Sequence, residues 1–305
     1  MNLIERKITQ FPEFFGLFAL FIVEVPWTRI ARLTVLGFSP VIVCVTGLLI
    51  ISYLYRRSNR SRALSEMAYY AAAMVLSGVC NLLLSYLVAR WSFSLKDAQF
   101  AAADVALGLS LPNWFLFLGK YHTFDDLLKV AYASLILQFS FSIIYFAHAA
   151  RAGRNKEMFW IVAMSSLLTA TISGLLPALG AFSHFHLSPD RATHLAHLTQ
   201  LRHPGEMVIR LTQLEGIITL PSYHAVLALV FIYLHRGNRV TFLLVLMLNL
   251  LVLLSTPTYG GHYFVDMIAG AAVAVSSIYL VWQWGQMQLR ESPKSHIDRS
   301  LHREA

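Results

Sequence analysis

Residues 240–284 read VTFLLVLMLNLLVLLSTPTYGGHYFVDMIAGAAVAVSSIYLVWQW. Two apolar blocks, 240–254 and 261–284, are separated by a short polar connection at 255–260. An α-helix needs about 20 apolar residues to cross roughly 30 Å of hydrocarbon, and the second block has that length. The stretch therefore predicts two helices that meet at one surface of a membrane.

Similar blocks occur through the rest of the chain. Five of them precede residue 240, at about 33–55, 67–88, 127–148, 159–179 and 221–234. Of the 305 residues, 57% are hydrophobic and only 13% are charged, too few charges to cover a soluble domain. We therefore predict an all-α polytopic transmembrane helix bundle. Because the fifth and sixth blocks are short and close together, the predicted count is six or seven spans.

Basic side chains cluster after alternate blocks and predict the topology. They follow the first, third, fifth and seventh blocks, as Arg56, Arg57, Arg60, Arg62, Arg151, Arg154, Lys156, Arg236, Arg239, Arg290, Lys294, Arg299 and Arg303. Short cytoplasmic loops are enriched in Lys and Arg, so these turns are predicted on the cytoplasmic side. We therefore attribute the net charge of +8 to basic residues that mark the cytoplasmic side of the membrane. Nucleic-acid binding would need a basic face on a soluble domain, and no nucleic-acid partner is expected.

The block pattern divides the chain into four regions. These are an N-terminal interfacial helix or extra span, an N-terminal transmembrane region, a C-terminal transmembrane core and a polar cytoplasmic tail, at 1–32, 33–158, 159–287 and 288–305. In the first region, Glu24 and Pro26 favour an interfacial helix. In the second, the stretch 95–118 mixes apolar residues with Lys96, Asp97 and Asp104, which predicts an amphipathic helix on the outer surface.

Two short sequences place histidines at the outer ends of apolar blocks. They are Leu220-Pro221-Ser222-Tyr223-His224-Ala225 and Gly260-Gly261-His262-Tyr263-Phe264-Val265-Asp266. In the first, Pro221 suits the first position of a helix. The backbone N–H groups that follow it would favour a bound phosphate, with His224 in the same turn.

The second sequence supplies a histidine and a carboxylate at helical spacing. His262 and Asp266 are four residues apart, which puts them on one face of a helix. A carboxylate bonded to one imidazole nitrogen leaves the other nitrogen able to attack. Gly260 and Gly261 allow close approach of the backbone to a substrate. A lone histidine at a helix end is usually an interfacial residue, but two such sequences on one side predict a phosphoryl-transfer site.

The two sequences resemble the second and third signatures of the type 2 phosphatidic acid phosphatase superfamily, over about 161–284. The usual second signature is Pro-Ser-Gly-His, and Ser255, His262 and Asp266 hold the spacing of the third. The Pro-Ser-x-His and His-Tyr-x-x-Asp variants look more like the branch with inositol phosphorylceramide and sphingomyelin synthases. The resemblance makes region 159–287 the expected catalytic core.

The resemblance also implies a role for each matching residue. His262 would be the nucleophile that forms a phosphohistidine, Asp266 would orient it, and His224 would protonate the leaving oxygen. Such an intermediate divides one transfer into two steps. The reaction would need no metal and no cofactor. Substrate contacts are assigned to Ser222, which would bind a phosphate oxygen, and to Tyr223 and Gly261.

The sequence departs from the family pattern in its cations. Tyr223 replaces the usual Gly, Thr256 stands at the Arg position of the third signature, and no Lys-x6-Arg-Pro first signature is present. Phosphoryl transfer depends on charge stabilisation. The substitute cations are expected in the outer connection at 180–220, as Arg191, Arg202 and Arg210. The same connection holds His184, His186, His194, His197 and His203, but without a carboxylate at ligand spacing we expect no metal site there.

These features predict hydrolysis or transfer of a lipid-linked phosphate at the outer face of a membrane. The expected substrate is a lipid phosphate or phospholipid, and the expected location is a bacterial inner membrane with the site facing the periplasm. One alternative is a transferase of phosphoinositol or phosphocholine head groups. Another is a non-catalytic membrane scaffold or transporter, although such a relative would be expected to lose His224, His262 or Asp266. The sequence indicates no oligomeric state.

Overall fold

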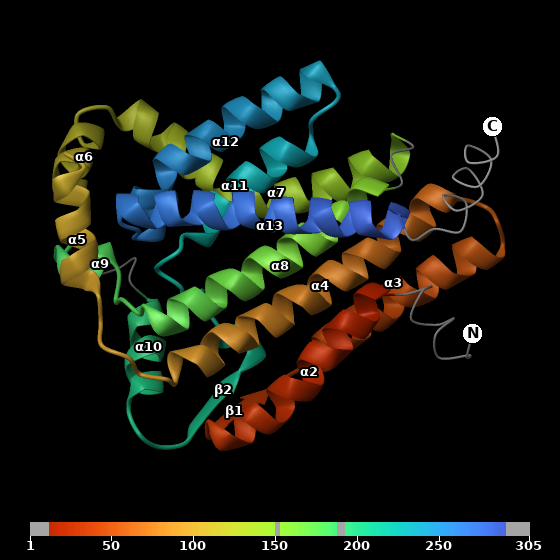
Figure 1. Ribbon diagram of the computed structural model, residues 1–305, viewed down its shortest axis with the longest axis horizontal. Helices are drawn as coiled ribbons and strands as arrows, with labels where there is room; N and C mark the ends of the chain where they lie inside the picture. Colours follow the sequence, from red (N-terminus) through yellow and green to blue (C-terminus); the bar gives the residue numbers. More distant parts are fainter. Residues whose placement is uncertain (1–11, 150–152, 188–192, 291–305) are drawn as a thin grey trace, which may run out of the picture.

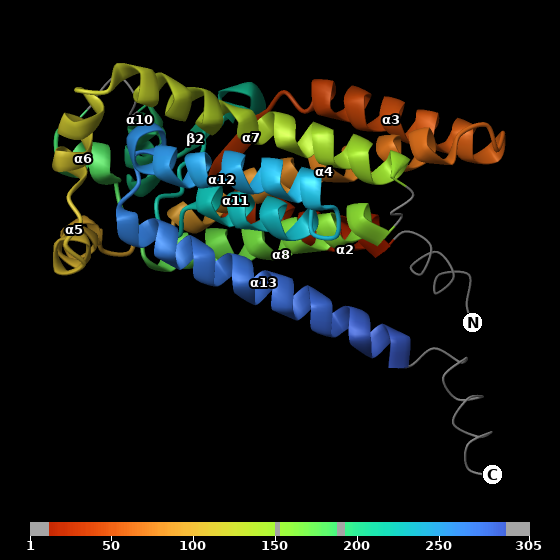
Figure 2. The same ribbon diagram turned by 90° about the horizontal axis from the view of Figure 1, so that it is seen from above.

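The computed structural model describes residues 12–149, 153–187 and 193–290. Within these residues, six helices are long and apolar enough to cross a membrane. They are α3 (Ser39–Arg57), α4 (Arg62–Ala89), α7 (His122–His148), α8 (Gly153–Leu175), α12 (Arg239–Gly260) and α13 (Phe264–Arg290). All six run lengthwise between the two ends of the molecule (Figures 1 and 2). The prediction of an all-α polytopic bundle is confirmed, and the chain is an integral membrane protein.

The fifth apolar block forms a short central helix, α11 (Tyr223–Leu234). Its 12 residues extend over about 18 Å, too short to cross the hydrocarbon layer alone. It packs against α7, α8, α12 and α13. Val226, Val230 and Phe231 are completely buried in the main core of the bundle. The helix is therefore apolar all round because its neighbours surround it.

One end of the bundle carries the basic turns. The turns between α3 and α4 and between α11 and α12 lie at the end away from α5 (Asp97–Ala106) and α6 (Leu111–Leu118) (Figure 1). This is the alternation that the basic clusters predict. Arg151, residues 1–11 and the tail beyond 290 lie outside the described residues.

The other end is covered by short helices. The predicted amphipathic stretch forms two of them, α5 and α6, which bend by 71° relative to each other. They lie across the end of the bundle with α9 (Ala181–His184) and α10 (His194–Arg202) close by (Figures 1 and 2). Gly108, with φ +73°, lies in the break between α5 and α6. These helices place loops from distant parts of the chain over the ends of α12 and α13.

A two-stranded parallel sheet was not anticipated by the hydropathy pattern. Strand β1 (Leu33–Leu36) pairs with β2 (Met207–Arg210), and a single 3₁₀ turn, η2 (Leu211–Gln213), follows β2. The expectation of a helix from residue 33 is therefore wrong for its first residues. Gly37 adopts φ +86°, which ends the strand, and Pro40 lies at the start of α3.

The N-terminal segment forms α2 (Pro12–Ile30), which packs along α4. It lies alongside the bundle helices and not across their ends (Figure 1). The buried Glu13 and Glu24 face the protein, and Phe18, Ile22 and Val23 are exposed on the other side. Helix α2 is not among the six helices that are long and apolar enough to cross a membrane, so the choice between an interfacial helix and an extra span stays a prediction.

Candidate active site

His262 lies in a turn between two helices. Helix α12 ends at Gly260, and Gly261 follows with φ +66°, a conformation that favours glycine. A Cβ at Gly261 would lie 2.8 Å from the Phe182 ring, and the Gly261 carbonyl accepts a 2.8 Å hydrogen bond from Ala181 N–H. The turn is thus closed from outside by the segment that carries α9.

The imidazole of His262 is oriented by a backbone carbonyl. Its Nδ1 lies 2.8 Å from the Thr219 carbonyl oxygen and 3.4 Å from Asp266 Oδ2. A carbonyl oxygen only accepts, so Nδ1 carries the hydrogen and, in the neutral ring, Nε2 keeps its lone pair. The nitrogen able to attack is therefore Nε2.

Asp266 differs from its expected geometry. Its Oδ2 accepts a 2.8 Å hydrogen bond from Tyr263 N–H, and Oδ1 is buried with no hydrogen-bond partner among the described residues. The helical spacing argument does not apply because α13 begins at Phe264, after His262. Asp266 contacts the imidazole, but its closest hydrogen bond stabilises the turn.

The start of α11 is fixed against α13. Ser222 is the N-cap of α11, its Oγ accepting from Ala225 N–H at 3.4 Å, and its own N–H donates to the Asp266 carbonyl at 2.9 Å. A Cβ at Gly270 would lie only 2.6 Å from the Ser222 carbonyl oxygen, so the two helices are in direct backbone contact. Pro221 precedes the N-cap, after a cis peptide bond, and does not occupy the first helical position as expected.

These contacts bring the two predicted histidines together. The ring centroids of His224 and His262 are 5.9 Å apart, with the planes at 63°. His224 stacks on the ring of Tyr132 at 4.5 Å between centroids. Both imidazoles line one cavity of about 670 Å³. They are near enough for one phosphoryl group to contact both.

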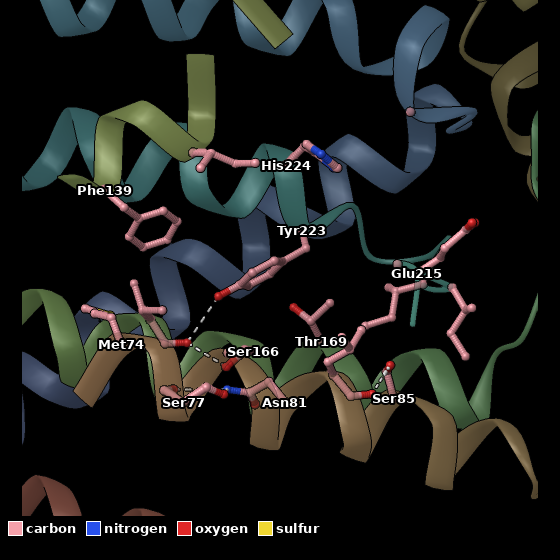
Figure 3. Close-up of a pocket in the computed structure, with 18 of the residues that line it drawn as sticks. Met74, Ser77, Asn81, Ser85, Phe139, Ser166, Thr169, Glu215, Tyr223 and His224 are labelled. Atoms are coloured by element: carbon pink, nitrogen blue, oxygen red, sulfur yellow. Dashed lines mark hydrogen bonds between the residues drawn. The ribbon is translucent and has the colours of Figure 1, made fainter. Parts of the chain in front are cut away.

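The cavity extends from the histidines into the bundle between α4, α7, α8 and α11 (Figure 3). Tyr223 projects across it from α11, and its hydroxyl donates to the Val162 carbonyl of α8 at 3.4 Å. Along α4 the lining runs from Ala71 to Ser85, about 21 Å of helix. The wall away from the histidines includes Met74 and Phe139 (Figure 3). The cavity is thus long, and the part away from the imidazoles combines Met74 and Phe139 with the hydroxyl groups of Ser77 and Ser166.

Three chemically notable residues of the lining were not predicted as site residues. Tyr132, His194 and Glu215 all face the cavity. A Cβ at Gly260 would lie 3.1 Å from the Tyr132 hydroxyl, which places that hydroxyl beside His262. His194 Nε2 lies 3.2 Å from the Leu179 carbonyl oxygen. In the sequence, Tyr132 is one aromatic in an apolar block and His194 is one of several loop histidines, so neither has a local signal.

Two carboxylates of α5 hold the loops around His262. Asp97 accepts from the N–H groups of Leu179 and Gly180, each at 2.9 Å, and from the Tyr263 hydroxyl at 2.9 Å. Asp104 accepts from the N–H groups at the start of α13, which have no partner within the helix. The sequence suggested surface charges at both positions. Asp104 is instead 2% exposed and caps α13.

Replacement of Asp104 by alanine is expected to destabilise the protein by about 2–3 kcal/mol, because two N–H groups at a helix start lose a charged acceptor. Thermal unfolding of the detergent-purified chain measures this loss. Asp126→Ala, at an exposed position of α7, removes the same charge and is expected to change stability by no more than about 0.5 kcal/mol. Equal effects of the two substitutions would exclude the capping role.

The arginines proposed as phosphate ligands do not line the cavity. Arg202 donates to the Phe93 carbonyl at 2.8 Å, and Arg210 lies exposed on β2. Arg191 lies outside the described residues. The described part of the lining contains no Lys or Arg, so it holds no side chain with a permanent positive charge. This corrects the expectation for Arg202 and Arg210, whose connection folds back over α4 and β1.

Burial lowers the pKa of His262 to about 4, while the hydrogen bond to the Thr219 carbonyl acts in the opposite direction. The ring is therefore neutral at physiological pH. The pKa of His262 in the folded protein lies below the ordinary value of about 6.5, so the neutral ring makes its full contribution to stability above pH 6.5. This contribution is lost as pH falls toward 4. We expect the ¹⁵N NMR signal of His262, assigned by its loss in His262→Gln, to titrate near pH 4. A midpoint near 6.5 would contradict the buried geometry.

The fold and the site together define an integral membrane protein with a paired-histidine cavity suited to phosphoryl chemistry. A family model described as the PAP2 superfamily matches residues 98–280. This is more than half of the chain, so the chain belongs to the PAP2 superfamily, whose members are phosphoester hydrolases and transferases. The match begins at α5, well before the expected start near 161. No curated protein and no solved structure gives a significant match.

Proposed function

We propose that the protein hydrolyses a lipid phosphate through a phosphohistidine on His262. The observation that carries this proposal is the shared cavity of His224 and His262, with the lone pair of His262 Nε2 available. Phosphoryl transfer needs positioning and charge stabilisation more than elaborate covalent chemistry. The described imidazoles supply a nucleophile and a proton donor side by side.

The chemistry proceeds in two balanced steps. His262 Nε2 attacks phosphorus, an N–P bond forms, and the P–O bond to the lipid breaks while His224 gives its proton to the leaving oxygen. Water then attacks the phosphohistidine, the N–P bond breaks, and His224 takes up the proton of that water. An alcohol in place of water would give transfer, with a new phosphoester as the product.

The shape of the cavity supports a lipid-linked substrate. A phosphate at the histidine end would leave acyl chains along α4 and α7, where Met74, Ile136 and Phe139 line the wall. The site lies toward the end of the bundle opposite the basic turns, so it would face the periplasm of a bacterial inner membrane. A non-catalytic scaffold would not need His224 and His262 to meet.

Head-group transfer is the second candidate, and the observation that favours it is Tyr223. Its ring occupies the cavity where the family signature has glycine, and reshapes the space beside His224. Thr256, which stands where the family signature has Arg, does not change the shape of the cavity. Its hydroxyl donates to the Val252 carbonyl within α12, and it does not line the cavity.

The full-length protein in detergent should release phosphate from phosphatidic acid in the presence of a chelator. Parallel reactions with phosphatidylinositol or phosphatidylcholine as donor and diacylglycerol or ceramide as acceptor distinguish transfer from hydrolysis. Folded protein that releases no phosphate and transfers no head group, or that loses activity with chelator, would contradict the proposal.

His224→Ala is expected to lower turnover of phosphatidic acid by about 10²–10⁴-fold, the usual contribution of a general acid. A lipid analogue with a nitrophenol leaving group needs no proton, so the loss with that substrate should be much smaller. Rates with the two leaving groups measure this difference. Equal losses would give His224 a positioning role only.

A further inference from the structure

A second cavity lies at the end of the bundle that carries the basic turns. Its volume is about 430 Å³, and its walls come from the starts of α2, α4 and α8 and from the end of α3. The cavity that holds the histidines also borders α4, but there the lining residues lie between Ala71 and Ser85. Residues of α4 between Arg62 and Tyr70 line the second cavity, so the two cavities are separate sites along one helix.

The charges in this lining favour an anion. Arg56, Arg62 and Lys156 supply three cations, against the carboxylates of Glu13 and Glu66. Both carboxylates already accept hydrogen bonds from neutral groups. Glu13 accepts from the Tyr69 hydroxyl at 2.8 Å, and Glu66 accepts from the Asn155 amide at 3.1 Å. Because these hydrogen bonds leave the carboxylate charges in place, the positive balance of the lining is the one charge by which three cations exceed two carboxylates.

The position of the cavity brings it next to lipid. Helix α3 packs mainly on α4, and its other faces are exposed. Ile50, Ile51 and Leu54 are 52%, 40% and 54% exposed, and in a membrane these side chains contact acyl chains. Arg56 lies in the last turn of α3, directly after these exposed apolar residues, and lines the cavity.

We infer that this cavity binds the phosphate-bearing head group of an anionic phospholipid in the leaflet on the basic side. Basic pockets between transmembrane helices on the cytoplasmic side are suited to such head groups. Arg56 and Arg62 have guanidinium groups that match phosphate oxygens, and Lys156 adds charge from α8. A free phosphate shares this chemistry, but the exposed apolar face of α3 beside the site favours the lipid.

Binding is measured on the detergent-purified full chain with dioctanoyl phosphatidylglycerol, dioctanoyl phosphatidylcholine and inorganic phosphate as separate ligands. The triple variant Arg56→Gln, Arg62→Gln, Lys156→Gln is compared with Arg57→Gln, Arg60→Gln, Arg239→Gln. The control removes three charges at exposed positions of the same end that do not line the cavity. Lys156→Gln alone serves if the triple variant does not fold.

Phosphatidylglycerol is expected to bind at least about tenfold more tightly than phosphatidylcholine or phosphate. The triple variant should lose about tenfold in affinity, Lys156→Gln about threefold, and the control less than twofold. Equal losses in test and control variants would show general charge attraction and overturn the inference. Phosphate binding as tight as that of the lipid would overturn the lipid assignment. Neither result depends on turnover at the histidines.

Discussion

Replacing His262 by alanine should lower turnover of a lipid phosphate by at least about 10³-fold, because the nucleophile of the proposed reaction is removed. The substitution creates a small polar cavity in a turn and leaves the spans unchanged. Folding is therefore expected to survive, as tested by a monodisperse elution profile and a cooperative thermal transition. Phosphate release from phosphatidic acid measures the loss.

His203→Ala is the matched control for this prediction. His203 lies exposed after α10 and does not line the cavity, so its loss should change turnover by less than about twofold. Comparable losses in His203→Ala and His262→Ala would mean that the outer connection, and not the paired imidazoles, limits activity. Substantial turnover in His262→Ala would exclude a covalent role for that ring.

Gly260→Ala should lower kcat/KM by about 10²-fold through one added methyl group. A Cβ at this position would lie 2.6 Å from His262 Cδ2 and 3.1 Å from the Tyr132 hydroxyl. The ring has little freedom to move, because it is buried and its Nδ1 is held by the Thr219 carbonyl. A displacement of about 1 Å is enough to cost about 10²-fold when reacting atoms must be aligned.

The stability of Gly260→Ala separates this effect from unfolding. Gly260 is a residue of α12 with no positive φ, where alanine is favoured over glycine by up to about 1 kcal/mol in helix propensity. Gly47→Ala in α3, where a Cβ would meet open space, gives the same change of propensity without a clash. Gly260→Ala with normal kcat/KM would show that the ring adjusts, and that its position is less restricted than the structure indicates.

The bundle could be predicted from hydropathy because spanning helices follow from length and apolar content alone. The 240–284 stretch contains most of α12 and α13, but α12 extends through the connection expected at 255–260, and α13 begins at Phe264 and continues to Arg290. The basic clusters identify the turns at one end. The meeting of His224 and His262 was also predictable, since both sequences lie at the same end of their blocks. Hydropathy could not show that α11 is a buried central helix, because burial in protein and burial in lipid select the same side chains.

The details around His262 depend on contacts that no local pattern contains. The Thr219 carbonyl that orients the ring has no side-chain signature. The contact between Asp266 and His262 was predicted, but the two residues do not share a helix, and the hydrogen bond from Tyr263 N–H to Asp266 was not expected. Asp97 and Asp104 appear as surface charges in an amphipathic stretch. They accept hydrogen bonds from backbone groups that lie far away from them in the sequence. The pairing of β1 with β2 has the same long-range origin.

The most direct measurement is the mass of the peptide containing His262, isolated by rapid quench during turnover of phosphatidic acid and kept at alkaline pH. A gain of one phosphoryl group on His262, absent from the His262→Ala protein and lost on acidification, is the expected result. Turnover with an unmodified His262 peptide, or with the phosphoryl group on another side chain, would contradict the assignment of His262 as the nucleophile.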